Sequence, residues 1–172
     1  MYRPNNESVP MTRRYPDLKQ KVLQRDSKIV KQLMKSWESQ HDRDAFLKLF
    51  LQKMNNLSDQ RYWELLRTVW ILSGGLDSIK TFRKLLKSNR KHQYYFSTPE
   101  EQERFRNMDE NFIVYRACND DNDGGISWTL YKAYAEQYKI DFNKEKVIEQ
   151  TVNKEDVYAI IERNKEEEII IL

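Results

Sequence analysis

At 172 residues and 20.9 kDa, the chain is long enough for one compact domain, or for a small domain with a helical extension. Its composition, 39% hydrophobic and 33% charged, suits a soluble protein, and no window approaches the roughly 20 apolar residues of a membrane span. The single cysteine, Cys118, excludes an internal disulfide. Because the N-terminus also lacks the apolar run of a signal peptide, we expect a cytoplasmic protein without a membrane partner.

The formal net charge of +3 conceals a strong asymmetry along the chain. Residues 1–95 contain 20 lysines and arginines against 9 acidic residues, a net charge of +11. Residues 96–172 contain 10 against 18, a net charge of −8. This division indicates either that the two parts dock through opposite charges or that the basic part meets an anionic partner.

Helical patterns dominate residues 16–110, which follow a tail, residues 1–15, without periodicity. The expected helices run from Pro16 to Trp37, from an Asp42 or Asp44 cap to Met54, from Arg61 to Leu72, and from Asp77 or Ser78 to Leu86. Thr98 and Pro99 mark a further start, because threonine caps helices and proline suits their first position.

After about residue 111 the pattern changes to short apolar runs typical of strands. We expect strands at 112–117, 126–128, 146–152, 156–161 and 168–172, and a helix from Leu130 to Tyr138. Residues 154–156 equally suit the start of a helical turn. The predicted fold is therefore α+β, with a basic helical region (16–110) followed by an acidic region with a small mixed sheet (111–172).

One motif imitates a nucleotide-binding loop in the wrong context. Residues 73–78, Ser-Gly-Gly-Leu-Asp-Ser, match the SGGxDS loop of the PP-loop ATP pyrophosphatases, whose backbone amides hold the pyrophosphate of ATP. That family needs a strand before the loop and a second parallel strand soon after its helix. Residues 62–72 fit a helix face better than a strand, and residues 81–106 contain no strand-like run. A helix end followed by a helix cap explains the motif, and ATP pyrophosphatase activity is kept as a second alternative.

Residues 119–126 imitate a calcium loop, with oxygen-bearing side chains at alternate positions and glycine sixth. The twelfth position is Leu130, where an EF-hand needs a bidentate glutamate, and a strand instead of a helix precedes the loop. An acidic turn between two strands explains the pattern, so we predict no metal site.

The last third of the chain carries a cation, a hydroxyl and carboxylates in one order. A strand ends in Val114-Tyr115-Arg116, a second contains Ser127-Trp128-Thr129 before a helix, and Glu166-Glu167-Glu168 precedes the apolar run 169–172. This order, over residues 112–172, resembles the ADP-ribosyltransferase family of the Arg-Ser-Glu type. It also resembles small phage and prophage proteins, whose location would be the host cytoplasm. Trp128 and Thr129 depart from the Ser-Thr-Ser motif of the family, and the loops between the motifs are short.

The resemblance implies a miniature ADP-ribosyltransferase fold that transfers ADP-ribose from NAD to a protein or other host target, an arginine side chain in the Glu-x-Glu class. By the same resemblance, Arg116 would bind the phosphate and ribose side of NAD, and Ser127 would order the ribose end. Thr129 and Trp128 complete the expected NAD-binding set. Glu168 would be the catalytic carboxylate, and Glu166 would orient or deprotonate the acceptor.

A competing hypothesis is a non-catalytic interaction protein on a degenerate fold of this type. Its basic helical part would bind nucleic acid or a host protein through charge.

Overall fold

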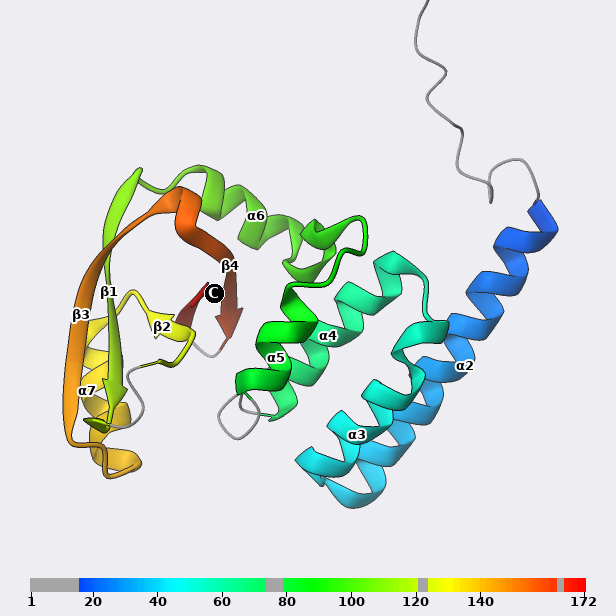
Figure 1. The fold of residues 1–172 in the computed structure, drawn as a ribbon, viewed down its shortest axis with the longest axis horizontal. Helices are drawn as coiled ribbons and strands as arrows, with labels where there is room; N and C mark the ends of the chain where they lie inside the picture. The colour runs from blue at the N-terminus through cyan, green and yellow to red at the C-terminus, as the bar shows by residue number, and fades with distance from the viewer. Residues whose placement is uncertain (1–15, 74–78, 121–123, 164–165) are drawn as a thin grey trace, which may run out of the picture.

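The computed structural model describes residues 16–73, 79–120, 124–163 and 166–172 (Figure 1). Within these ranges it contains six α-helices and one five-stranded antiparallel sheet, which confirms the α+β class. The helices are α2 (Pro16–Gln40), α3 (Arg43–Lys53), α4 (Asp59–Ser73), α5 (Ile79–Leu86), α6 (Pro99–Arg106) and α7 (Lys132–Asp141). The strands are β1 (Asn111–Cys118), β2 (Ser127–Thr129), β3 (Lys146–Asn153), β4 (Val157–Arg163) and β5 (Glu166–Ile171).

Short polar motifs set the starts of two helices. The Asp42 side chain accepts a hydrogen bond from the Ala45 amide at 3.0 Å, which caps α3. At α6, Thr98 and Glu101 form a reciprocal capping box, with Pro99 at the first helical position. Both predicted starts are confirmed, whereas the predicted helix end and caps at residues 74–78 lie outside the described residues.

The helices α2, α3 and α4 pack side by side, and α2 lies at the far end of the molecule from β1 and β3 (Figure 1). Large apolar side chains fill the space between the helices and reach the sheet. They include Leu33, Phe46, Phe50, Trp63, Leu66, Trp70 and Phe82. Ile161 and Ile170 of the sheet belong to the same core, so the apolar interior continues across residue 110.

The strand order is β3-β1-β2-β5-β4, which places the three-residue β2 between β1 and β5. Tyr115 of β1 lies opposite Thr129 of β2, and Thr129 lies opposite Glu168 of β5. The last strand begins at Glu166, two residues earlier than predicted, because Glu166 and Glu167 already pair with β4. The three glutamates therefore lie within the strand and not before it.

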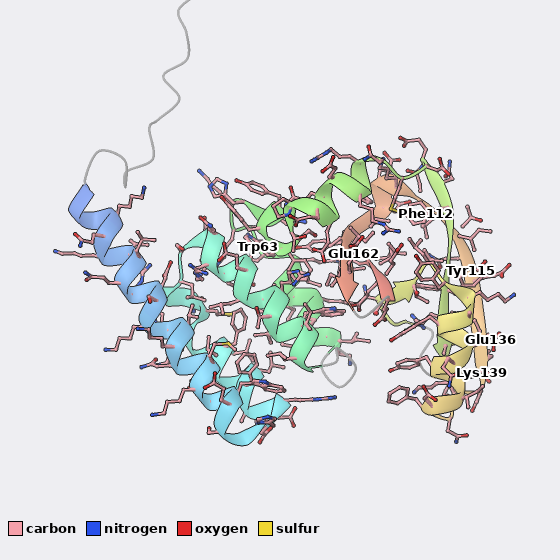
Figure 2. All side chains as sticks on the ribbon, turned by 180° about the vertical axis from the view of Figure 1, so that it is seen from behind. Trp63, Phe112, Tyr115, Glu136, Lys139 and Glu162 are labelled. Carbon is pink, nitrogen blue, oxygen red and sulfur yellow. The ribbon has the colours of Figure 1, made fainter. Side chains whose placement is uncertain are left out.

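The two faces of the sheet have different neighbours. Val114, Trp128 and Ile169 lie on one face, where Phe105 of α6 packs against them. Ile161 and Ile170 lie on the other face, which meets the helical core. We call this second face the inner face, and α7 covers its β1 end, where Tyr115 lies (Figure 2).

In the described ranges, no helix has both the length and the apolar composition that a bilayer span requires.

Candidate active site

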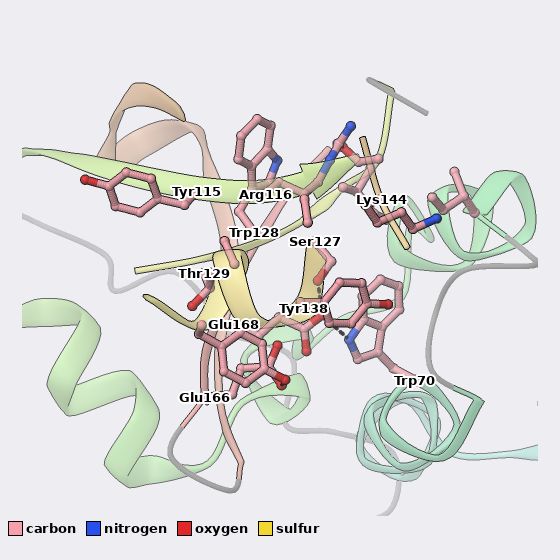
Figure 3. Close-up of a pocket in the computed structure, with 16 residues that line it drawn as sticks. Trp70, Tyr115, Arg116, Ser127, Trp128, Thr129, Tyr138, Lys144, Glu166 and Glu168 are labelled. Atoms are coloured by element: carbon pink, nitrogen blue, oxygen red, sulfur yellow. Dashed lines mark hydrogen bonds between the residues drawn. The ribbon is translucent and has the colours of Figure 1, made fainter. Parts of the chain in front are cut away.

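A pocket of about 100 Å³ opens on the inner face of the sheet (Figure 3). Its floor is formed by β2 and β5, with Trp70 of α4 on one side and α7 on the other. Aromatic rings and two carboxylates line it together: Trp70, Tyr115, Tyr134, Tyr138, Glu166 and Glu168. The helical region thus supplies one wall, and the region with the family resemblance supplies the floor and the other wall.

Strand alternation brings three of the predicted site residues together. Ser127 and Thr129 are two positions apart on β2, so they point to the same face, and Glu168 lies opposite Thr129. The Ser127 hydroxyl donates a hydrogen bond to Oε1 of Glu168 across the two strands (Figure 3). The Thr129 hydroxyl accepts a hydrogen bond from the Tyr131 amide at 3.2 Å, which fixes the turn that leads into α7.

Glu168 is deeply buried, with 1% of its surface exposed. Its Oε1 accepts a second hydrogen bond, at 3.1 Å, from the indole Nε1 of Trp70. Two donors on one carboxylate oxygen hold the side chain in a fixed orientation. Trp70 precedes Glu168 by 98 positions, and its helical spacing indicates only a core residue, so the sequence gives no signal of this contact.

The other two glutamates of the run point to opposite faces, as neighbours in a strand must. Glu166 faces the pocket, where the Tyr134 hydroxyl donates to its Oε2 at 2.9 Å. Glu167 lies on the outer face, where it accepts a hydrogen bond from Tyr131 and pairs with Arg104. The hydrogen bond to this carboxylate raises the pKa of the Tyr131 hydroxyl. The pocket therefore receives Glu166 and Glu168, the two glutamates of the Glu-x-Glu pattern, and not Glu167.

Arg116 points to the outer face of the sheet. It follows Tyr115, which faces α7, so alternation directs it away from Ser127 and Glu168 (Figure 3). Its guanidinium lies 4.9 Å from the centre of the Trp128 ring, and Nη1 donates to the Gly125 carbonyl at 2.5 Å. The structure therefore pairs Arg116 with Trp128 and does not bring its charge to the Ser127–Glu168 pair.

Lys144 is a cation of the pocket wall that the sequence did not single out. It is half-buried and follows the C-terminal end of α7. Nearby, the ring of Tyr138 stacks on Phe142 at a centroid distance of 4.2 Å, and Phe142 is 57% exposed. A lysine in a surface turn has no periodic or motif signal, so only the fold reveals its place at the pocket.

The chain matches no protein-family model, no curated protein and no solved structure. A buried carboxylate with fixed donors, next to aromatic rings, suits a flat group that carries or develops positive charge.

The calcium-like loop contributes Gly125 and Ile126 to the lining of this pocket, whereas no described acidic side chain of that loop and no described residue of the glycine-rich motif lines it. The glycine-rich motif lies between two helices, because α4 ends at Ser73 and α5 begins at Ile79. The described strand pairs are all antiparallel, which is not the parallel sheet that the pyrophosphatase loop requires. Residues 121–123 of the calcium-like loop lie outside the described part, and the residues that the structure does describe hold no group of three potential metal ligands.

Proposed function

We propose that the pocket binds the nicotinamide end of NAD and that the protein transfers ADP-ribose to a nucleophilic acceptor on a host target. The observation that carries the proposal is the carboxylate of Glu168, held by Ser127 and Trp70 at the floor of an aromatic pocket. The order of the Ser127 and Glu-x-Glu motifs, which resembles that of ADP-ribosyltransferases, supports the same reading.

The size and lining of the pocket support part of a dinucleotide as ligand. Its volume of about 100 Å³ is below the roughly 300–1,000 Å³ of sites that enclose a drug-sized molecule. One ring with its ribose therefore enters, and the adenosine part lies outside on the surface. The nicotinamide ring of NAD is positively charged, so the faces of Trp70 and Tyr138 and the carboxylate of Glu168 complement it.

In the proposed reaction the bond between the nicotinamide nitrogen and ribose C1 breaks. The electron pair leaves with nicotinamide, the acceptor nucleophile attaches to C1, and the acceptor loses a proton. Glu168 stabilises the positive charge that develops on the ribose, because it is fixed and shielded from water. Glu166, oriented by Tyr134, takes the proton of the acceptor.

The position of Arg116 requires another cation for the diphosphate. We assign this role to Lys144. Both Lys144 and Arg116 border the pocket, but strand alternation directs the Arg116 guanidinium to the outer face, against Trp128. Arg116 then supports the sheet beneath the pocket through the Gly125 carbonyl. This assignment departs from the role that the family resemblance gives to Arg116.

The decisive comparison is between Glu168→Gln and the native chain, incubated with labelled NAD and a host lysate. A glutamine oxygen still accepts from Ser127 and Trp70, so the fold is retained while the charge is lost. We expect transfer of label to fall by about 100-fold or more, the usual effect of removing one electrostatic group from a transition state. The matched control is Glu149→Gln, an exposed carboxylate of the same sheet, which leaves transfer unchanged.

Calorimetry measures the binding of NAD directly and so separates binding from cleavage. A native chain that neither binds nor consumes NAD contradicts the proposal. A chain that binds NAD in this pocket but never cleaves it contradicts the transferase reaction and supports the non-catalytic alternative. Label transfer that survives Glu168→Gln contradicts the role of that carboxylate.

A further inference from the structure

We infer that the outer face of α2 binds the phosphate backbone of a nucleic acid. Four exposed lysines, Lys21, Lys28, Lys31 and Lys35, define this face, which we call the α2 stripe. Lys21, Lys28 and Lys35 repeat every seven residues, so they lie nearly in line, about 10 Å apart along the helix axis. Figure 2 shows the side chains of α2 projecting away from the other helices, many of them tipped with nitrogen.

Within α2, acidic residues flank the stripe only at its ends, where Asp17 lies one turn before Lys21 and Glu38 one turn after Lys35. Between residues 19 and 37, all described, the only acidic residue is Asp26, which is 2% exposed and accepts hydrogen bonds from Ser58 of the turn before α4. Lys31 lies one turn from both Lys28 and Lys35, and like charges at this spacing repel and weaken a helix. An anionic partner removes that repulsion, because its phosphates lie between the ammonium groups.

The arrangement of the molecule does not supply that partner internally. The acidic part of the chain comprises α6, α7 and the sheet, and α2 lies at the far end of the molecule from β1, β3 and α7 (Figure 1). Where the two parts do meet through charge, α4 is the element involved: Arg67 pairs with Glu101 at 2.6 Å. Of the two readings of the charge asymmetry, docking of opposite surfaces thus does not account for the α2 stripe.

The chemistry of the stripe favours nucleic acid over a membrane. The apolar side of α2, with Ile29 and Leu33, is buried against the other helices. Among the described side chains of α2, Leu23 is the one large apolar group left exposed, which is too little for a face that enters a bilayer. Gln24, Ser27 and Gln32 are exposed among the lysines, and amide and hydroxyl groups bond to phosphates and base edges. A helix about 10–12 Å across also fits the roughly 12 Å wide major groove of DNA.

The test is fluorescence anisotropy of the full chain with a labelled 20-base-pair DNA duplex, an RNA duplex and a single-stranded RNA. If four lysines each neutralise one phosphate, a plot of the logarithm of the association constant for DNA against the logarithm of the salt concentration has a slope of about −3.6. The affinity then falls about 150-fold between 50 and 200 mM salt. The variant Lys28→Gln/Lys31→Gln/Lys35→Gln should reduce the slope to about −1.

The matched control removes the same charge elsewhere. Lys48→Gln/Lys84→Gln/Lys87→Gln changes three exposed lysines outside α2, and it should keep the native slope. Thermal melts of both variants confirm that each is folded. Equal weakening by the two variants would show that only net charge matters and would overturn the proposal.

Two further outcomes also overturn it: no binding to any of the three nucleic acids at 50 mM salt, or binding to phosphatidylserine vesicles in their place. The difference between the DNA and RNA probes identifies which polymer is preferred. The inference does not depend on the pocket, and Glu168→Gln is expected to leave nucleic-acid binding unchanged.

Discussion

Replacing Trp70 by phenylalanine tests whether the helical part of the chain holds the candidate catalytic carboxylate. The substitution keeps an aromatic ring in the core but removes the indole N–H that donates to Glu168 at 3.1 Å. Hydrogen bonds to charged groups contribute about 1.5–3 kcal/mol, and those to neutral groups about 0.5–1.5 kcal/mol. We therefore expect the lost bond to cost about 2 kcal/mol, in addition to the loss of ring area.

Trp63 provides the matched control. It is equally buried, and its indole N–H donates at 2.8 Å to the carbonyl of Lys91, a neutral acceptor far from the pocket. Trp63→Phe removes the same atoms, so the loss of ring area largely cancels between the two variants. The difference in the free energy of unfolding should be about 1 kcal/mol, with Trp70→Phe the less stable.

Urea and thermal unfolding, followed by far-ultraviolet circular dichroism, give the free energy of unfolding of each variant. A difference of 1 kcal/mol corresponds to about 2–4 °C in Tm for a chain of this size. Only Trp70→Phe should also weaken NAD binding, because Trp70 lines the pocket. If Trp63→Phe proves to be as costly as Trp70→Phe or costlier, the hydrogen bond from Trp70 to Glu168 is not the stronger of the two, and the reasoning fails.

Two further predictions concern stability. Burial raises the pKa of Tyr62 and Tyr158, so the folded state favours their protonated hydroxyls. Their contribution to the free energy of unfolding is complete below pH 10. Above pH 10 each tyrosine loses up to about 1.4 kcal/mol of that contribution per pH unit. Urea titrations at pH 8, 10 and 11 should show this fall in the free energy of unfolding. If the free energy of unfolding of Tyr158→Phe fell as steeply with pH as that of the native chain, the prediction would be contradicted. A Cβ at Gly125 would lie 2.5 Å from Nη1 of Arg116, so Gly125→Ala should cost about 1–3 kcal/mol. The cost should shrink in an Arg116→Met background, and full additivity of the two changes would show that the guanidinium is not what the new methyl group displaces.

Local signals account for the elements that the sequence predicted well. The cap at Asp42, the capping box at Thr98 and the apolar runs of the strands each depend on a few neighbouring residues. The predicted strands agree with the observed ones to within two residues at either end. The pairing of β2 with β5, which brings Ser127 next to Glu168, is not a local property, because these residues are 41 positions apart.

Local signals do not predict to which face of the sheet the Arg116 side chain points. Alternation states only that Tyr115 and Arg116 point to opposite faces, and either one could have shared a face with Ser127. The choice depends on the register that pairs Tyr115 with Thr129, a property of two strands together. Trp70 and Lys144 reach the pocket through packing between distant elements, and neither lies in a motif.

The shortness of β2 has a mechanical consequence. The ends of the sheet, β1 with β3 and β4 with β5, are joined through only three residues. The helix α7 packs mainly on β1 and β3, although its Tyr134 also bonds to Glu166 of β5, whereas Trp70 packs against the second pair through the core that it shares with Ile170. A small change in twist between the two pairs would therefore alter the distance between Tyr138 and Trp70, the two aromatic walls of the pocket.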